Sequence, residues 1–203
     1  MNMFKQDTPQ FESFKEFRWF FTSQGTLVIG GKSDDQNEKV LKKFLLNNFI
    51  VLHTSEPGSG FVIIQNDNPS KQDIKESAIF CACFSQNWKK LKNKNNRINV
   101  DIFKREQMYK TSFMKKGTFG VKGKKEIISV NPKLYLIMQK GVLRSVSVAS
   151  KNETIAIIQP GTLSKKEAVE SIRILIKNKF NYPISNEEIE QAIPSDKLSV
   201  SLK

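Results

Sequence analysis

The chain has 203 residues, 38% of them hydrophobic, and a formal net charge of +13. Fifteen phenylalanines supply material for a core and exclude a wholly disordered chain. No run approaches the ~18 apolar residues of a membrane span, and Met1–Gln10 has no apolar signal region, so no integral membrane association is expected. Two cysteines and one histidine exclude a disulfide framework and a four-ligand zinc site, and they predict a reducing, cytoplasmic location.

In the first half of the chain, short β segments alternate with helices. Residues 17–22 and 26–29 are rich in aromatic and β-branched side chains and flank a turn, so we expect a hairpin. Ser33, followed by two aspartates, predicts the start of a helix that runs to about Leu46. We also expect strands at 49–53 and 61–65. A long helix is expected to follow the cap Ser70 and to run from 71 to about 89.

The second half contains mostly strands, followed by helices. A Lys/Asn-rich loop is expected over 89–96 and irregular chain over 105–117. The expected strands are 98–103, 118–122, 127–130, 134–138, 142–148 and 154–158. Ser164, with Glu167 at the capping-box position, predicts a helix to about Phe180, and a short helix is expected over 186–192. The tail after Pro194 is expected to be mobile.

This order of elements has no regular βαβ repeat. It predicts an α+β fold with a mixed, largely antiparallel sheet, packed helices and a C-terminal helical extension. The expected organisation is an N-terminal tail over 1–16, a main domain over 17–150, and a C-terminal strand and helical extension over 151–203.

The positive charge is concentrated in the middle of the sequence. Residues 86–126 carry a net +10 and residues 127–152 a net +4, whereas residues 1–85 sum to −1 and residues 153–203 to zero. A lysine excess that came from genome composition alone would be spread along the chain. A dense basic segment favours a phosphate-binding surface, because each Lys or Arg that neutralises a phosphate releases a condensed counterion. A solvated basic face is the alternative.

Three short motifs do not by themselves indicate chemistry. Gly30-Gly31-Lys32 before a helix resembles a phosphate cradle, but it lacks the P-loop spacing, and the aspartates that follow would repel phosphate, so a tight turn is favoured. His53 has no partner motif, and a structural or hydrogen-bonding role is favoured over that of a general base. Cys81 and Cys83 point to different sides of a helix and are expected to be small core residues.

Aromatic residues are interleaved with the basic segment. Most of them are expected in the core, and the two in the least regular stretch, Tyr109 and Phe113, are the candidates for stacking on unpaired bases.

Taken in order, several blocks resemble the NFACT-R domain, the RNA-binding module of NEMF- and RqcH-type ribosome quality-control proteins, which also occurs as a stand-alone protein. The blocks are Trp19-Phe20-Phe21, Leu27 to Lys32, Gln36-Asn37-Glu38, the strand ending at His53 with the glycine-containing loop after it, Ala82 to Ser85 with Trp88, Gln107 to Lys110, Gly117-Thr118-Phe119 and Val121 to Lys125. They cover roughly residues 17–126. The resemblance implies an α+β RNA-binding domain linked to tRNA, rRNA or the ribosome, without a catalytic site.

We therefore expect a non-enzymatic RNA-binding protein that requires no metal or cofactor. The residues expected to contact RNA are Lys32, His53, Lys89, Lys104, Arg105, Lys110, Lys122, Lys124 and Lys125. Two other functions are weighed against it: an adaptor that docks its basic face on an acidic protein, with the C-terminal region as a protein-binding element, and a nucleic-acid-processing enzyme that uses His53.

Overall fold

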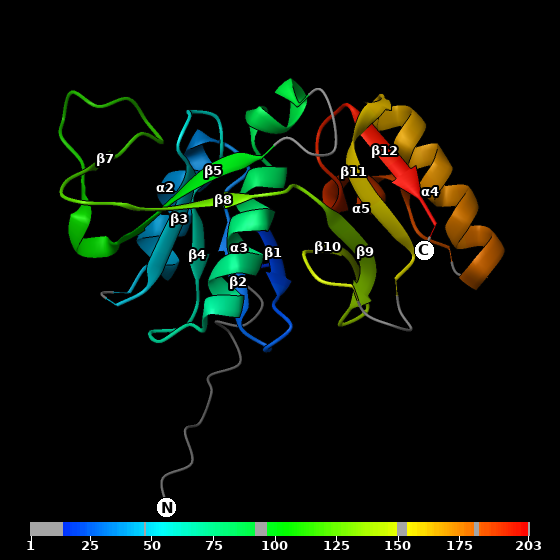
Figure 1. Ribbon diagram of the computed structural model, residues 1–203, viewed down its shortest axis with the longest axis horizontal. Helices are drawn as coiled ribbons and strands as arrows, with labels where there is room; N and C mark the ends of the chain where they lie inside the picture. Colours follow the sequence, from blue (N-terminus) through cyan, green and yellow to red (C-terminus); the bar gives the residue numbers. More distant parts are fainter. Residues whose placement is uncertain (1–13, 47, 92–96, 150–153, 181–182, 203) are drawn as a thin grey trace, which may run out of the picture.

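The strands form two antiparallel sheets and a two-stranded ribbon within the residues that the computed structural model describes, which are 14–46, 48–91, 97–149, 154–180 and 183–202. The α+β fold with antiparallel pairing is confirmed (Figure 1). The helices are α2 (Asp34–Phe44), α3 (Lys71–Cys83), α4 (Lys165–Phe180), α5 (Asn186–Ala192) and the 3-10 helices η1 (Gln86–Lys90) and η2 (Arg105–Gln107). The strands are β1 (Arg18–Phe21), β2 (Leu27–Gly30), β3 (Ile50–Thr54), β4 (Val62–Ile64), β5 (Ile98–Lys104), β6 (Met108–Tyr109), β7 (Gly120–Val121), β8 (Glu126–Val130), β9 (Leu134–Gln139), β10 (Val142–Val146), β11 (Ala156–Leu163) and β12 (Leu198–Ser201).

The larger sheet has the order β1-β2-β4-β3-β5-β8 and is covered on both faces. Successive strand residues point to opposite faces, so Trp19 and Ile29 pack with α2, while Phe20 and Val28 pack with α3. Ser33 begins α2 by accepting a hydrogen bond from Gln36 N, as expected from the sequence.

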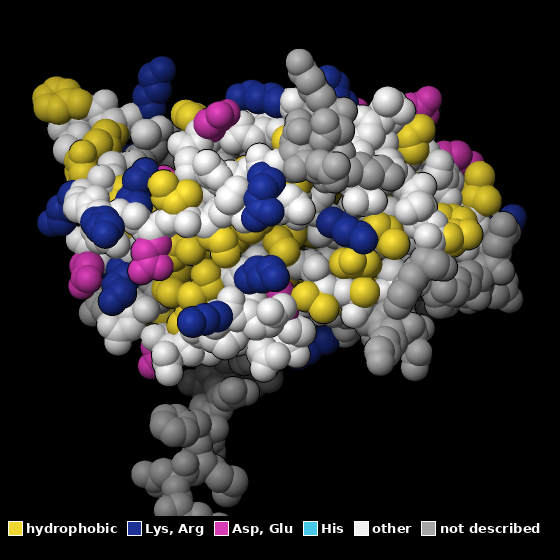
Figure 2. Space-filling model, viewed as in Figure 1, with side chains coloured by type: hydrophobic (Ala, Val, Ile, Leu, Met, Phe, Trp, Pro, Cys, Tyr) yellow, Lys and Arg dark blue, Asp and Glu magenta, His cyan; other side chains and the backbone are white. Residues whose placement is uncertain are grey.

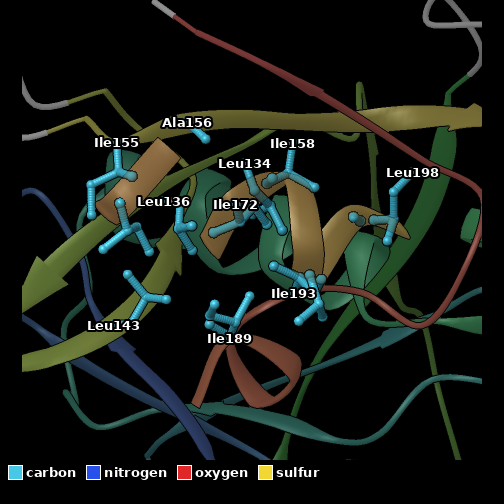
Figure 3. Close-up of a cluster of buried hydrophobic side chains, with 14 of the residues drawn as sticks. Leu134, Leu136, Leu143, Ile155, Ala156, Ile158, Ile172, Ile189, Ile193 and Leu198 are labelled. Atoms are coloured by element: carbon cyan, nitrogen blue, oxygen red, sulfur yellow. The ribbon is translucent and has the colours of Figure 1, made fainter. Parts of the chain in front are cut away.

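The smaller sheet has the order β10-β9-β11-β12, and α4 and α5 pack on one face of it. Figure 3 shows its core, in which aliphatic side chains from the strands meet those from the two helices. The labelled members are Leu134, Leu136, Leu143, Ile155, Ala156, Ile158, Ile172, Ile189, Ile193 and Leu198. The predicted capping box of α4 is confirmed, because Ser164 N donates to Glu167 Oε2 at 2.8 Å and Ser164 Oγ accepts from Glu167 N.

Helix α3 lies between the two cores and is shared by both. Cys81 faces the core of the larger sheet and Cys83 the core of the smaller one, so the expectation that both are core residues pointing to different sides is confirmed. Gln139 of β9 adds a polar link, because its side-chain amide donates to Phe21 O at 2.8 Å and accepts from Phe21 N at 2.9 Å. The two sheets are thereby joined through side chains as well as through the chain itself.

Three expectations about the fold are wrong. The stretch 105–117, expected to be irregular, contains the 3-10 helix η2 and the strand β6. The helix after Ser70 ends at Cys83 rather than near Lys89, because Ser85 caps a separate 3-10 helix by accepting from Asn87 N at 3.2 Å. The segment after Pro194 is not a mobile tail. It forms β12, in which Leu198 is fully buried, and pairs with β11.

The expected division of the chain at residues 150 and 151 falls in 150–153, outside the described residues. In the described chain, the last strand of the larger sheet ends at Val130 and the first strand of the smaller sheet begins at Leu134.

Candidate nucleic-acid interface

Residues 105–125, the later part of the basic segment, form a ribbon that projects from one end of the larger sheet (Figure 1, left). It leaves β5 through η2, continues through β6, turns, and returns through β7 to β8. Gln107 joins the two sides of the ribbon at its base. The side-chain Nε2 of Gln107 donates to Lys124 O at 2.8 Å, and its backbone carbonyl accepts from Lys122 N at 2.8 Å. A strand is found at Gly120–Val121, within the expected range 118–122.

Polar contacts hold the ribbon against α2. Glu38 Oε1 accepts from Lys110 Nζ at 2.8 Å and from Gly117 N at 2.9 Å. Both contacts hold the pKa of Glu38 below its ordinary value, and the hydrogen bond from Lys110 has the larger effect. Arg105 Nη1 donates to Leu45 O at 2.8 Å, which satisfies a carbonyl at the C-terminal end of α2.

A second ion pair joins Lys116 of the ribbon loop to Asp35 in the first turn of α2. The hydrogen bond from Lys116 lowers the pKa of Asp35. The loop thus meets α2 at both Asp35 and Glu38, on one side of the helix.

A groove of about 780 Å³ lies between α2 and the ribbon. Its apolar lining comes from both sides and consists of Leu41, Leu45, Met108, Tyr109 and Phe119. The ring of Tyr109 lies against Gly120, where a Cβ atom would come within 2.2 Å of the ring carbon Cζ. Since Tyr109 is nonetheless 45% exposed, one part of its ring is fixed and another is open to solvent.

Cations line the same groove from both elements. Lys39 and Lys42 come from α2, and Arg105, Lys110 and Lys116 come from the ribbon. The two α2 lysines were missed in the sequence, because Asp34, Asp35 and Glu38 cancel their charge in a count by segment. Their spacing of three residues places both on one side of α2, and this is the signal that marks them.

The predicted residues Lys104, Lys122 and Lys124 lie at the base of the ribbon with exposed side chains. None of the three has a salt bridge within the described part of the chain. Arg105 and Lys110, in contrast, use donors to hold the ribbon in place. The first three are therefore better placed to meet a phosphate.

Lys125 and His53 lie near the foot of the ribbon in more enclosed surroundings. Lys125 pairs with the buried carboxylate of Asp101, which also accepts from Ser55 Oγ at 2.5 Å. The ring of His53 lies against that of Phe61, with 4.9 Å between centroids and a tilt of 40°, and its Nδ1 lies 2.7 Å from Thr54 O. Burial lowers the pKa of His53, so its imidazole is neutral at pH 7.

The remaining predicted residues are separated from the groove or stand clear of it. Lys32 lies on the loop before α2, and its Nζ donates to Glu16 O at 3.0 Å. Lys89 lies on η1 and is half-buried. Phe113 is 96% exposed in the ribbon loop, so its ring has almost no protein contact.

The face in Figure 2 shows how the charges spread over this half of the molecule. Dark-blue Lys and Arg side chains are interleaved with yellow hydrophobic ones over the region of β5, β7 and β8, with few magenta carboxylates. Among the described residues, no group of three or more His, Cys, Asp or Glu side chains is placed to hold a metal ion. In the same residues, no helix is long and apolar enough to cross a membrane.

An antiparallel α+β domain with a cation-lined groove and partly exposed aromatic rings has the features of a nucleic-acid-binding protein. Residues 16–123 match the model of the NFACT protein RNA binding domain, and the chain belongs to this family.

Comparison with curated proteins finds relatives of greater length. The chain is 27% identical over 134 residues to the human ribosome quality control complex subunit NEMF, a match that covers 62% of this chain and 12% of NEMF. It is 25% identical over 208 residues to the archaeal Rqc2 homolog aRqcH of Methanocaldococcus jannaschii, covering 96% of this chain and 30% of aRqcH. The chain thus spans less than a third of either relative.

A solved structure shares the fold. The C-terminal part of the fibronectin/fibrinogen-binding protein from Streptococcus suis is 20% identical and superposes with a TM-score of 0.51, covering 65% of this chain and 48% of that one.

Proposed function

We propose that this protein binds RNA without catalysis and acts on tRNA, rRNA or the ribosome in ribosome quality control. The supporting observation is the groove between α2 and the ribbon, where lysines border an apolar floor that includes the half-exposed ring of Tyr109. Lysine side chains neutralise backbone phosphates, and aromatic faces stack on unpaired bases.

The ribosomal context comes from the relatives. NEMF is a subunit of the ribosome quality control complex, and aRqcH is an archaeal Rqc2 homolog. The family match covers β1 to β7, which includes both α2 and the ribbon, so the groove lies within the matched region.

Single strands or loops of RNA suit this groove better than a regular duplex. An A-form duplex presents a deep, narrow major groove that side chains do not read, whereas unpaired bases are free to stack. The exposed Phe113 and the half-exposed Tyr109 offer rings at two places along the ribbon.

The test is binding to tRNA and to ribosomal RNA fragments over a series of salt concentrations. We expect the logarithm of affinity to fall with the logarithm of salt, by about 0.7 per phosphate contact on a single strand. The variant Lys104→Glu/Lys122→Glu/Lys124→Glu reverses the exposed charge at the ribbon base and should weaken binding to all RNAs alike.

Its matched control reverses three exposed lysines on α3 and α4, in Lys71→Glu/Lys166→Glu/Lys177→Glu. Both variants change the net charge equally, so the control reports the effect of total charge alone. Equal affinities of the two variants would count against the ribbon as the RNA-binding surface. Protein partners that survive nuclease treatment in a pull-down would favour the adaptor instead.

Lys125 is left out of the variant because its ammonium pairs with the buried carboxylate of Asp101. Reversing it would place two carboxylates together and disturb the fold. RNA that stays intact on incubation with the wild type and His53→Ala, with and without divalent metal, is the result expected for a protein without nuclease activity.

A further inference from the structure

Arg18 of β1 is a half-buried cation that has no salt bridge among the described residues. Its guanidinium carbon lies 4.8 Å from the centre of the Phe84 ring, and its Nη1 donates to Gly31 O at 3.3 Å. Its Nε is buried and has no hydrogen-bond partner. Burial lowers the pKa of Arg18 to about 10, which reflects the cost of a desolvated charge.

Further cations gather around Arg18. The pKa of Lys32 is lowered, first by partial burial and then by the charges of Arg18 and Arg144. The charge of Glu16 acts in the opposite direction and offsets this lowering only in part. Lys165 of α4 is also close enough to Arg18 for the two charges to interact. The larger sheet and the C-terminal region therefore bring positive charge to the same place.

Carboxylates near these cations interact mainly with the outer members of the group. The charge of Glu188 acts to raise the pKa of Arg144, and the charges of Glu190 and Asp196 act to raise the pKa of Lys165. None of these three forms a salt bridge with Arg18 among the described residues. The guanidinium at the centre of the group is therefore not paired directly with a carboxylate in the described part of the chain.

Arg18 and Lys32 line a polar pocket of about 250 Å³. Close backbone contacts fix its wall, because a Cβ atom on Gly60 would lie 2.2 Å from Gly31 O. Asn37 Oδ1 accepts from Phe61 N at 3.1 Å, which ties α2 to the same loop. A pocket so constrained is preorganised and does not need to be assembled by its ligand.

We propose that this pocket binds a phosphate group. Arg18 offers a planar set of N–H donors, and Lys32 offers an ammonium that donates to Glu16 O and has further N–H groups to spare. The combination is suited to phosphate oxygens. The small polar residues Ser33, Ser85 and Ser195 line the same pocket. The volume is below the ~300 Å³ at which pockets for drug-sized ligands begin, so it fits one phosphate group or a small part of a nucleotide.

Two features define the limits of the site. Asp34 also lines the pocket from the first turn of α2, and its charge opposes an anion there. Ser195 comes from the segment between α5 and β12, so the C-terminal region completes a pocket whose cations Arg18 and Lys32 lie in the family-matched part.

The pocket is separate from the proposed RNA groove, since the two cavities share no lining residue. The inference goes beyond the proposed function and does not depend on it. The variant with reversed charge at the ribbon base should keep the response to phosphate, whereas variants of Arg18 or Lys32 should lose it.

The experiment measures the unfolding temperature against inorganic phosphate, with chloride at matched ionic strength as the reference. We expect phosphate to raise the unfolding temperature of the wild type, and Arg18→Met and Lys32→Gln to weaken the apparent affinity at least tenfold. Arg173→Met and Lys177→Gln, on the exposed side of α4, are the matched controls and should respond as the wild type does.

Arg18→Met separates binding from structure. Methionine is an apolar side chain of similar length and removes a desolvated charge that has no salt bridge among the described residues, so without phosphate the variant should unfold no earlier than the wild type. If this variant fails to fold, the exposed Lys32→Gln decides the question alone. A wild type that responds equally to phosphate and chloride, or variants that respond as strongly as the wild type, would overturn the proposal.

The source of the phosphate is resolved with a 5′-mononucleotide and with one RNA oligonucleotide carrying either a 5′-phosphate or a 5′-hydroxyl. A 5′-phosphate that strengthens binding tenfold in the wild type but not in Lys32→Gln assigns the pocket to an RNA end. Equal binding of the two oligonucleotides, with a Lys32-dependent response to the mononucleotide or to inorganic phosphate, assigns it to a small phosphate compound.

Discussion

Glu38 and Lys110 form a contact that decides where the basic ribbon lies. Glu38 Oε1 is 2.8 Å from Lys110 Nζ and also accepts from Gly117 N at 2.9 Å. A single carboxylate oxygen of α2 therefore holds two points of the ribbon loop. Lys110 Nζ in addition donates to the carbonyls of Lys115 and Thr118, so the same ammonium organises the loop that it anchors.

Replacing Glu38 with glutamine should loosen the ribbon without unfolding the domain. The neutral amide keeps the shape but loses the charge-assisted bond to Lys110. We expect faster proteolysis within residues 110–119 and little change in the unfolding temperature. Glu170→Gln, which removes an exposed ion pair on α4, is the control and should leave the proteolytic pattern unchanged.

The same contact should depend on pH in a defined direction. The pKa of Glu38 is lower in the folded protein than its ordinary value of 4.5, so the contact persists at pH 4.5 and is lost only as the pH falls further. Amide hydrogen exchange of Gly117, corrected for its intrinsic rate, should accelerate in that lower window. Loosening that begins well above pH 4.5 would show that another group controls the ribbon.

Gly117→Ala should destabilise the protein more than Gly25→Ala. Both glycines have left-handed φ angles, +75° and +79°, so both variants incur a backbone cost of about 1–2 kcal/mol. A Cβ atom on Gly117 would also lie 2.6 Å from Asp34, whereas Gly25 faces open space. We expect at least about 1 kcal/mol of additional loss for Gly117→Ala in chemical denaturation. Equal losses would mean that the ribbon is not seated against α2.

Phe113→Ala should weaken RNA binding and leave stability unchanged. Its side chain is 96% exposed, so its removal costs the fold little. If the ring stacks on a base, affinity should fall by about 1–3 kcal/mol in a titration with single-stranded RNA. Ile174→Ala, at an exposed apolar position on α4, controls for the loss of surface hydrophobicity. Unchanged affinity would leave Tyr109 as the stacking candidate.

Leu198→Ala should cost about 2–5 kcal/mol of unfolding free energy, because this side chain of β12 is fully buried in the smaller core. Leu202→Ala removes the same atoms four residues later, where the side chain is 60% exposed, and should change the free energy by about 0.5 kcal/mol or less. Denaturant titration of the two variants is the measurement. If Leu198→Ala lowered the unfolding free energy as little as Leu202→Ala, residues 198–201 would behave as an unpacked tail and not as a strand.

The sequence by itself predicted the elements whose causes are local. Apolar periodicity and the caps Ser33, Ser70 and Ser164 defined the helices, and the hairpin of β1 and β2 followed from aromatic segments around a turn. The order of strands and helices also predicted the α+β class. These features depend on neighbours within a few residues, so a sequence read in order contains them.

Where local signals competed, tertiary contacts decided. The helical pattern after Ser70 continued to Trp88, but Ser85 starts a 3-10 helix whose Gln86 N donates to Gly58 O at 2.7 Å, across the pocket wall. The segment after Pro194 has three alternating apolar residues, Leu198, Val200 and Leu202, at the very end of the sequence, a short strand signal. It became β12 because the edge of β11 was there to pair with it.

Charge counting located the basic segment between residues 86 and 126, and the motifs there indicated the family. Charge along a sequence does not determine which ammonium groups remain available in space. Only the tertiary structure committed Lys110 to Glu38 and Lys125 to Asp101, left Lys122 and Lys124 exposed, and added Lys39 and Lys42 from a segment with no net positive charge. It also brought Lys32 next to the half-buried Arg18, because the sheet places residues from separate strands and loops around one pocket, a proximity that sequence separation does not encode.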